Sequence, residues 1–174
     1  MNAMAAWWNG DWKRLLGASV SSTYFIYYAS TPNDWHFIDY VDLIIHEAGH
    51  LVFLPFGEFI HILGGSLFQT IFPLLYVGYF YFKKDLFSSA LLLFWVGVNL
   101  INVSVYAADA QLMQLPLLGG DSVIHDWNYI LGYTHTIQYA PQIASCIYGM
   151  GVLLVGVAAI VAMYSSQHRP VAAR

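Results

Sequence analysis

Apolar segments long enough to cross a membrane make up most of residues 35–164 and leave few folds open to this chain. Charged residues form 9% of the sequence, against about 25% in a typical soluble domain, and the one strongly charged internal loop is Lys83-Lys84-Asp85. Inside lipid the backbone must satisfy its own hydrogen bonds, and a helix does so within one segment. The sequence therefore predicts an all-α, polytopic integral membrane bundle with about four transmembrane helices.

The whole chain, residues 1–174, is too short for a separate soluble domain beside such a bundle, so we expect one membrane domain. Its metal-site bundle should occupy residues 35–164, with spans over residues 35–56, 58–82, 86–110 and 140–164. Gly64, Gly65 and Pro73 fall within the second span. They predict a bend or a re-entrant stretch before the helix resumes.

Residues 1–34 are expected to form an N-terminal anchor, and residues 165–174 a tail. Trp7, Trp8 and Trp12, with Lys13 and Arg14, lie at the start of the anchor, and such residues settle at the level of the lipid headgroups. A polar patch over residues 19–23 follows. We therefore expect residues 11–30 to form an interfacial helix, in preference to a short span.

The basic residues predict an orientation. Lys83 and Lys84 should face the cytoplasm, and Arg169 and Arg174 fit a cytoplasmic C-terminus. The connection over residues 111–139 then lies outside. A bacterial inner membrane is the simplest location for such a chain.

One apolar segment contains a metal-binding signature, His46-Glu47-Ala48-Gly49-His50. On a helix, residues four apart share a face, so His46 and His50 can bind one zinc ion while Glu47 reaches a metal-bound water. Burying such groups in hydrocarbon costs several kcal/mol unless they are paired or coordinated. The pattern therefore predicts a zinc site that performs metal-assisted hydrolysis, nearer the external side in this orientation.

A catalytic zinc site needs a third protein ligand, which should come from another segment. The predicted external connection supplies three candidates within six residues, Asp121, His125 and Asp126. Asp121 with Ser122 also resembles a helix N-cap, and Asp109 is a reserve candidate. The sequence leaves the choice between these residues open.

Further polar residues recur at helical spacing. Asp42 lies one turn before His46, where its carboxylate could hold the ligand's second ring nitrogen, whereas Asp39 reads as a helix-start acid facing water. Asn99 and Asn102 share one face, along with Tyr106 and Asp109. They either join helices by hydrogen bonds or line a hydrated cleft and bind substrate. His61 is expected to hydrogen-bond locally, apart from the metal site.

These motifs resemble those of the site-2 protease family of intramembrane zinc metalloproteases. His46, Glu47 and His50 match that family's first motif, residues 64–69 look like a loose version of its glycine-rich segment, and residues 117–121 contain the residue types of its later aspartate motif in altered order. The resemblance covers about residues 40–130, and its first motif is the specific one. It implies that His46 and His50 bind zinc, that Glu47 is the general base, and that an aspartate completes the site.

The resulting hypothesis is a membrane-embedded zinc metalloprotease that cleaves a peptide bond of a membrane protein or peptide in or next to the bilayer. One rival is a non-enzymatic membrane protein, such as an accessory subunit, whose His and acid cluster holds a structural or transported metal. Another is a haem-binding subunit, with His46 or His50 paired to His125. Membrane lipid and a larger complex or oligomer are plausible partners. Nucleic acid is not, because no basic cluster exists.

Overall fold

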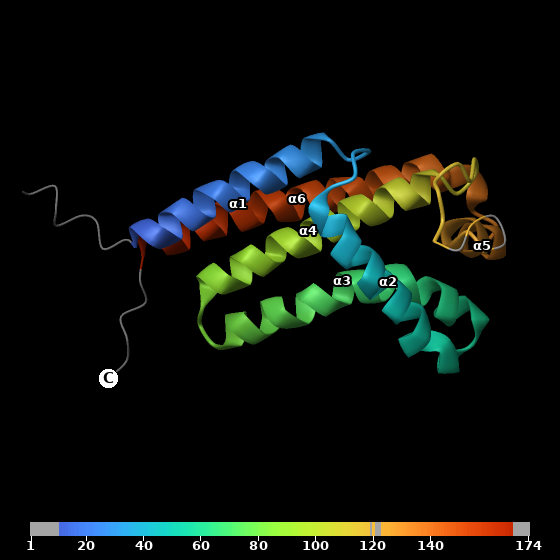
Figure 1. The fold of residues 1–174 in the computed structure, drawn as a ribbon, viewed down its shortest axis with the longest axis horizontal. Helices are drawn as coiled ribbons and strands as arrows, with labels where there is room; N and C mark the ends of the chain where they lie inside the picture. The colour runs from blue at the N-terminus through green and yellow to red at the C-terminus, as the bar shows by residue number, and fades with distance from the viewer. Residues whose placement is uncertain (1–10, 119, 121–122, 169–174) are drawn as a thin grey trace, which may run out of the picture.

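The computed structural model describes residues 11–118, 120 and 123–168, and these residues form helices and connections without a strand (Figure 1). This confirms the all-α prediction. In chain order the elements are α1 (Trp12–Ser30), α2 (Phe37–Phe53), the 3-10 turn η2 (Leu54–Phe56), α3 (Glu58–Phe82), α4 (Leu86–Ala108), α5 (Asp126–Tyr133), the 3-10 turn η4 (Ile137–Tyr139) and α6 (Ala140–Gln167).

Three of these helices are long and apolar enough to cross a membrane, namely α3, α4 and the stretch Ile137–Gln167 that contains α6. This is consistent with an integral membrane protein. The fourth expected span, over residues 35–56, is the 17-residue helix α2 followed by η2. Such a helix is shorter than the roughly 20 residues that a crossing needs.

The second predicted span is one uninterrupted helix. α3 keeps α-helical backbone through Gly64, Gly65 and Pro73, so the expected re-entrant stretch is wrong. The glycines have another use, which is close packing against α2. A Cβ atom built on Gly64 would lie 2.7 Å from Cβ of Phe53 and 2.9 Å from the carbonyl oxygen of Gly49. The two backbones therefore touch where the metal-binding signature faces α3.

A second glycine contact joins α4 to α6. A Cβ atom on Gly97 would lie 3.0 Å from the carbonyl oxygen of Gly151, and one on Gly151 would lie 2.7 Å from that of Gly97. Around this contact the main apolar core is built from α1, α4 and α6, with Phe94, Val98 and Ile101 fully buried in it. Small residues at such crossings let helices approach closely where hydrophobic driving force between helices is absent.

α1 runs antiparallel beside α6 (Figure 1). The amide of Asp11 donates to the carbonyl of Ser166 at 3.1 Å, and the hydroxyl of Tyr148 donates to the carbonyl of Ala29 at 2.7 Å. One bond lies at each end of α1, so α1 contacts α6 over nearly its full length. Because α6 continues to Gln167, the helix includes the first three residues of the predicted tail. Trp7, Trp8, Arg169 and Arg174 lie outside the described residues.

The two ends of the bundle differ. At one end the loop Lys83–Asp85 joins α3 to α4, and Asp85 lies 4.0 Å from Arg14 at the start of α1. At the other end α4 is followed by the connection that carries α5, which packs on α3 and α4. α2 lies across α3 and brings the metal-binding signature toward this second end (Figure 1).

Candidate metal centre

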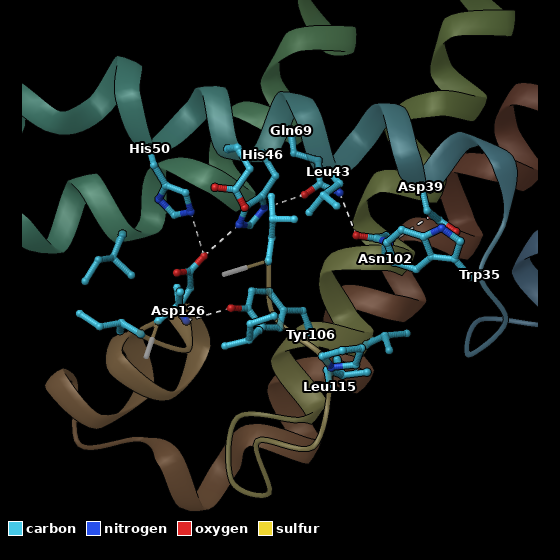
Figure 2. Close-up of a pocket in the computed structure, with 18 of the residues that line it drawn as sticks. Trp35, Asp39, Leu43, His46, His50, Gln69, Asn102, Tyr106, Leu115 and Asp126 are labelled. Atoms are coloured by element: carbon cyan, nitrogen blue, oxygen red, sulfur yellow. Dashed lines mark hydrogen bonds and ion pairs between the residues drawn. The ribbon is translucent and has the colours of Figure 1, made fainter. Parts of the chain in front are cut away.

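Two histidines and one aspartate converge between α2 and α5. Nε2 of His46 lies 2.9 Å from Oδ2 of Asp126, and Nε2 of His50 lies 3.2 Å from the same oxygen (Figure 2). Asp126 is 80 residues from His46 in sequence and is the first residue of α5. Among the described residues this is the group whose nitrogen and carboxylate atoms, all within 4.8 Å of one another, could hold a metal ion.

Each histidine is held by its other ring nitrogen. Nδ1 of His50 lies 2.9 Å from the carbonyl oxygen of His61, and Nδ1 of His46 lies 3.0 Å from Oε1 of Gln69. Carbonyl and amide oxygens only accept, so each Nδ1 must carry a proton and donate it. In a neutral imidazole the Nε2 atom then has a free lone pair. In their neutral state both rings thus point an unprotonated nitrogen at Asp126.

This arrangement suits a zinc ion. Three acceptors facing one another repel unless positive charge joins them, and one divalent cation satisfies all three. Ligand atoms of a tetrahedral zinc ion with bonds of about 2.0–2.1 Å lie roughly 3.3 Å apart, close to the 2.9 and 3.2 Å found between the Nε2 atoms and Oδ2. Gly65 makes room for the first ring, since a Cβ atom there would lie 2.7 Å from Cδ2 and Cε1 of His46.

Asp126 is fixed by its neighbours on the bundle. Its amide donates to the hydroxyl of Tyr106 on α4 at 3.0 Å, and the indole of the next residue, Trp127, donates to the hydroxyl of Ser66 on α3 at 3.1 Å. Burial acts to raise the pKa of the Asp126 carboxyl, but when His46 and His50 also carry a proton on Nε2, their hydrogen bonds and positive charges hold that pKa below its ordinary value. The carboxylate is therefore ionised beside the two rings.

The centre opens onto a cavity of about 760 Å³. Glu47, half-buried, lines this cavity with the three candidate ligands, and Glu58 is exposed at its edge. The connection after α4 contributes an apolar wall (Figure 2). Its members are Leu115, Pro116, Leu117, Leu118, Val123 and Ile124.

Two other candidates for the third ligand, His125 and Asp109, lie outside the cluster. His125 is the N-cap of α5, where its Nδ1 accepts from the amide of Asn128 at 3.2 Å, and its Nε2 lies 3.2 Å from Oδ2 of Asp109. His125 and Asp109 therefore pair with each other instead of joining the cluster. Asp121 lies outside the described residues.

The acids on α2 have roles that the sequence did not indicate. Asp42 accepts from the indole nitrogen of Trp95 at 2.6 Å and does not hold His46, whose Nδ1 is taken by Gln69. The expectation that Asp39 faces water is wrong, because it is 2% exposed. Its carboxylate accepts from the amide of His36, so it caps α2 from inside the bundle.

The two asparagines on α4 lie in different surroundings. Asn99 is fully buried and its Nδ2 donates to the carbonyl of Trp95 at 2.9 Å, whereas Asn102 lines the cavity and bonds to Asp39 and Gln69. Asn102 thus joins helices and also lies in the cleft wall. The sequence indicated a role for Gln69 in one way only. An amide side chain in an apolar span is unfavourable unless it has a hydrogen-bond partner.

His61 hydrogen-bonds locally, as expected, but not apart from the site. Its Nδ1 lies 2.8 Å from the carbonyl oxygen of His50, while its own carbonyl holds the ring of His50. The two residues thus tie α3 to α2 directly behind a candidate ligand.

Comparison of the chain with family models, with curated proteins and with solved structures gives no match. The resemblance to site-2 proteases thus rests on the motifs alone.

Proposed function

We propose that this chain is a membrane-embedded zinc metalloprotease that hydrolyses a peptide bond of a membrane protein or peptide in or next to the bilayer. The observation that carries the proposal is the convergence of two Nδ1-protonated histidines and one carboxylate on a single point beside Glu47. Three protein ligands and a neighbouring cavity are the pattern of a catalytic zinc site, because a structural site uses a fourth protein ligand instead.

In this proposal His46, His50 and Asp126 hold zinc. Zinc bound there polarises the scissile carbonyl and makes water easier to deprotonate. Glu47 follows His46 directly on α2 and lines the same cavity. Its carboxylate takes the proton of the attacking water and passes it to the leaving amine, so that the charge returns to its starting state.

Tyr106 is the residue that we assign to the developing charge on the carbonyl oxygen. Its hydroxyl accepts from the amide of Asp126, and among the described residues no hydrogen bond uses its own proton. Tyr106 lines the cavity, with its ring centroid 6.0 Å from that of His46. The hydroxyl proton is thus available to an oxygen of the substrate. Asn102 is less suited, since both ends of its amide are engaged.

We further propose that α1 crosses the membrane with the three apolar helices, and that α2, which joins the end of α1 to the start of α3 on one side, enters the membrane from that side without crossing it. α1 has its full length against α6, which favours a crossing over an interfacial position, and burial of Asp39, Asp42 and His46 turns the polar side of α2 inward. The Lys83–Asp85 loop is then cytoplasmic and the metal centre is nearer the opposite side. A bacterial inner membrane remains the proposed location.

The test combines metal analysis with proteolysis by the detergent-purified chain. The wild type should hold about one zinc per chain and cleave a fluorescent casein or peptide library, with activity lost to a chelator. Glu47→Gln keeps the shape of the side chain but not its basicity, so zinc should remain while turnover falls by about 10²–10⁴. Wild-type turnover in Glu47→Gln, or a metal-free wild type, would contradict the proposal.

A further inference from the structure

Asp39 is connected to the metal centre by a chain of hydrogen-bonded side chains from three helices. Its Oδ1 lies 3.1 Å from Nδ2 of Asn102, whose Oδ1 lies 2.9 Å from Nε2 of Gln69, whose Oε1 in turn lies 3.0 Å from Nδ1 of His46 (Figure 2). We infer that Asp39 is a positioning residue that fixes the proton of His46 on Nδ1 through this chain. The inference rests on the proposed metal site.

The direction of the chain is set at Asp39. Its Oδ2 accepts from the amide of His36 at 2.6 Å, and its Oδ1 accepts from the hydroxyl of Tyr28 at 2.6 Å. A carboxylate offers only acceptors, so the group of Asn102 that faces it must be the NH₂ group. The orientation of this amide is thereby decided by chemistry.

Each later link has one solution. With its NH₂ group on Asp39, Asn102 turns its oxygen toward Gln69, which must answer with its own NH₂ group. The oxygen of Gln69 then faces His46, so Nδ1 of that ring must donate. In the neutral ring Nε2 is then unprotonated, so its lone pair can bind a metal ion shared with Asp126. The carboxylate thus selects, over two amides, the tautomer that can bind metal.

Burial gives the chain its strength. Asp39 and Gln69 are each 2% exposed, so water does not compete for their hydrogen bonds. Metal-binding histidines commonly donate their second nitrogen directly to a carboxylate or carbonyl. The carboxylate one turn before His46, Asp42, instead accepts from Trp95 through Oδ1. A carboxylate thus acts on His46 from Asp39, through two amides, and not from Asp42.

The variant Asp39→Asn tests the inference because it keeps the shape of the side chain but reverses the donor–acceptor direction of the hydrogen bonds between position 39 and His46. The amide oxygen of the new side chain must face the fixed amide of His36, so its NH₂ group faces Asn102. Asn102 and Gln69 would then turn over, and the NH₂ group of Gln69 would donate to Nδ1 of His46. The proton of His46 moves to Nε2, and zinc affinity should fall about 10–100-fold.

A second substitution should repair the first. In Asp39→Asn with Gln69→Glu, the carboxylate at position 69 accepts from Asn102 on one side and from His46 on the other. The ring regains its proton on Nδ1, and zinc affinity should return to within about threefold of the wild type. Gln69→Glu alone puts a carboxylate against the oxygen of Asn102, so its affinity should lie below that of the double variant.

The matched control is Asp42→Asn, which alters a buried carboxylate on the same helix that bonds to Trp95 and not to the chain. Its zinc affinity should stay within about threefold of the wild type. Zinc competition titration measures affinity, and ¹⁵N chemical shifts of the His46 ring in metal-free Asp126→Ala variants, where no carboxylate faces Nε2, report the tautomer that is set through Gln69.

The two readouts separate this inference from the proposed function. In the Asp126→Ala background, a His46 ring protonated on Nδ1 when Asp39 is present and on Nε2 in Asp39→Asn would support the hydrogen-bond chain, whether or not the full-length wild type binds zinc. A folded Asp39→Asn protein in which the His46 tautomer is unchanged would overturn the inference. So would a double variant, Asp39→Asn with Gln69→Glu, that binds zinc as weakly as Asp39→Asn does. If His46→Ala loses zinc while Asp39→Asn binds it normally, the proposed metal site is supported and the role of Asp39 is contradicted.

Discussion

At the scale of single residues, each candidate ligand is held by a second hydrogen bond from another helix. Gln69 of α3 holds the ring of His46, the carbonyl of His61 on α3 holds His50, and Tyr106 of α4 holds the backbone of Asp126. Ligands oriented before the ion arrives lose little freedom on binding it, which strengthens binding and fixes the geometry. The centre therefore depends on α3 and α4 as much as on α2.

The third ligand can be identified by substitution. Asp126→Asn keeps the volume but removes the negative charge between the two rings, so zinc content should fall from about one per chain to near zero. His125→Asn retains a good N-cap for α5, and Asp121→Asn serves as the remaining comparison, so both should keep zinc. Elemental analysis of purified chains measures this. Zinc retained in Asp126→Asn and lost in either of the others would reassign the ligand.

Tyr106→Phe tests the residue assigned to the carbonyl oxygen. The ring and its packing against His125 remain, with a centroid distance of 4.4 Å, while the hydroxyl proton is lost. Turnover should fall about 10²–10³-fold with little change in KM, as when one donor to a developing oxyanion is removed. Steady-state kinetics on a cleavable peptide provide the measurement. A change confined to KM would instead assign Tyr106 to substrate binding.

The metal-binding signature could be predicted from the sequence because its spacing is local. Residues four apart share a helix face, so His46 and His50 needed no tertiary information. Asp126 was one of three candidates, since the choice depends on where α5 starts. Gln69 was missed because its role requires the distance between α2 and α3. The role of Asp39 was predicted incorrectly for the same reason, since the start of a helix usually faces water.

At the scale of helices, the contact between α2 and α3 sets the position of the metal centre. Gly49 lies within the signature itself, between Glu47 and His50, and a Cβ atom there would lie 2.7 Å from Cβ of Phe68 and 2.9 Å from the carbonyl carbon of Gly64. Helices α3, α4 and α6 were predictable from apolar length. The continuity of α3 was not, because glycine and proline signal breaks in sequence whatever the packing they permit.

Gly49→Ala should push α2 away from α3. Overpacking of this kind costs about 1–3 kcal/mol, and the same shift should weaken zinc binding because His46 and Gln69 lie on the two helices that separate. Gly78→Ala on α3 is the control, since a Cβ atom there meets nothing within 4 Å, and it should keep or raise stability. Thermal unfolding in detergent and zinc titration measure both effects. Equal stability of the two variants would contradict close, rigid packing of α2 against α3 at Gly49.

At the scale of the whole molecule, three features gather at one end of the bundle. The start of α1 bonds to the end of α6, and Arg14 of α1 lies 4.0 Å from Asp85 in the loop between α3 and α4. The connection that carries Asp126 lies at the other end (Figure 1). A membrane that holds α3, α4 and α6 therefore separates the loop from the connection.

Cysteine labelling tests this arrangement. In a Cys146→Ser background, Trp12→Cys and Lys83→Cys should react with a membrane-impermeant maleimide on one side of oriented vesicles, and Leu118→Cys on the other. Trp12 and Leu118 are 62% and 61% exposed, so reagent access does not limit the result. Labelling of Lys83→Cys and Leu118→Cys from the same side would contradict the proposed crossing.

The contact between Gly49 and Gly64 also has an evolutionary consequence. Where two main chains touch, no side chain remains that could shrink to accept a change on the opposite helix, so the pair can vary only together with a shift of α2. The apolar wall of the cavity is free of this restriction. Descendants of a common ancestor should therefore diverge in the residues that meet a substrate while these two positions stay glycine, and the spacing of the two glycines would identify kinship more reliably than the cavity.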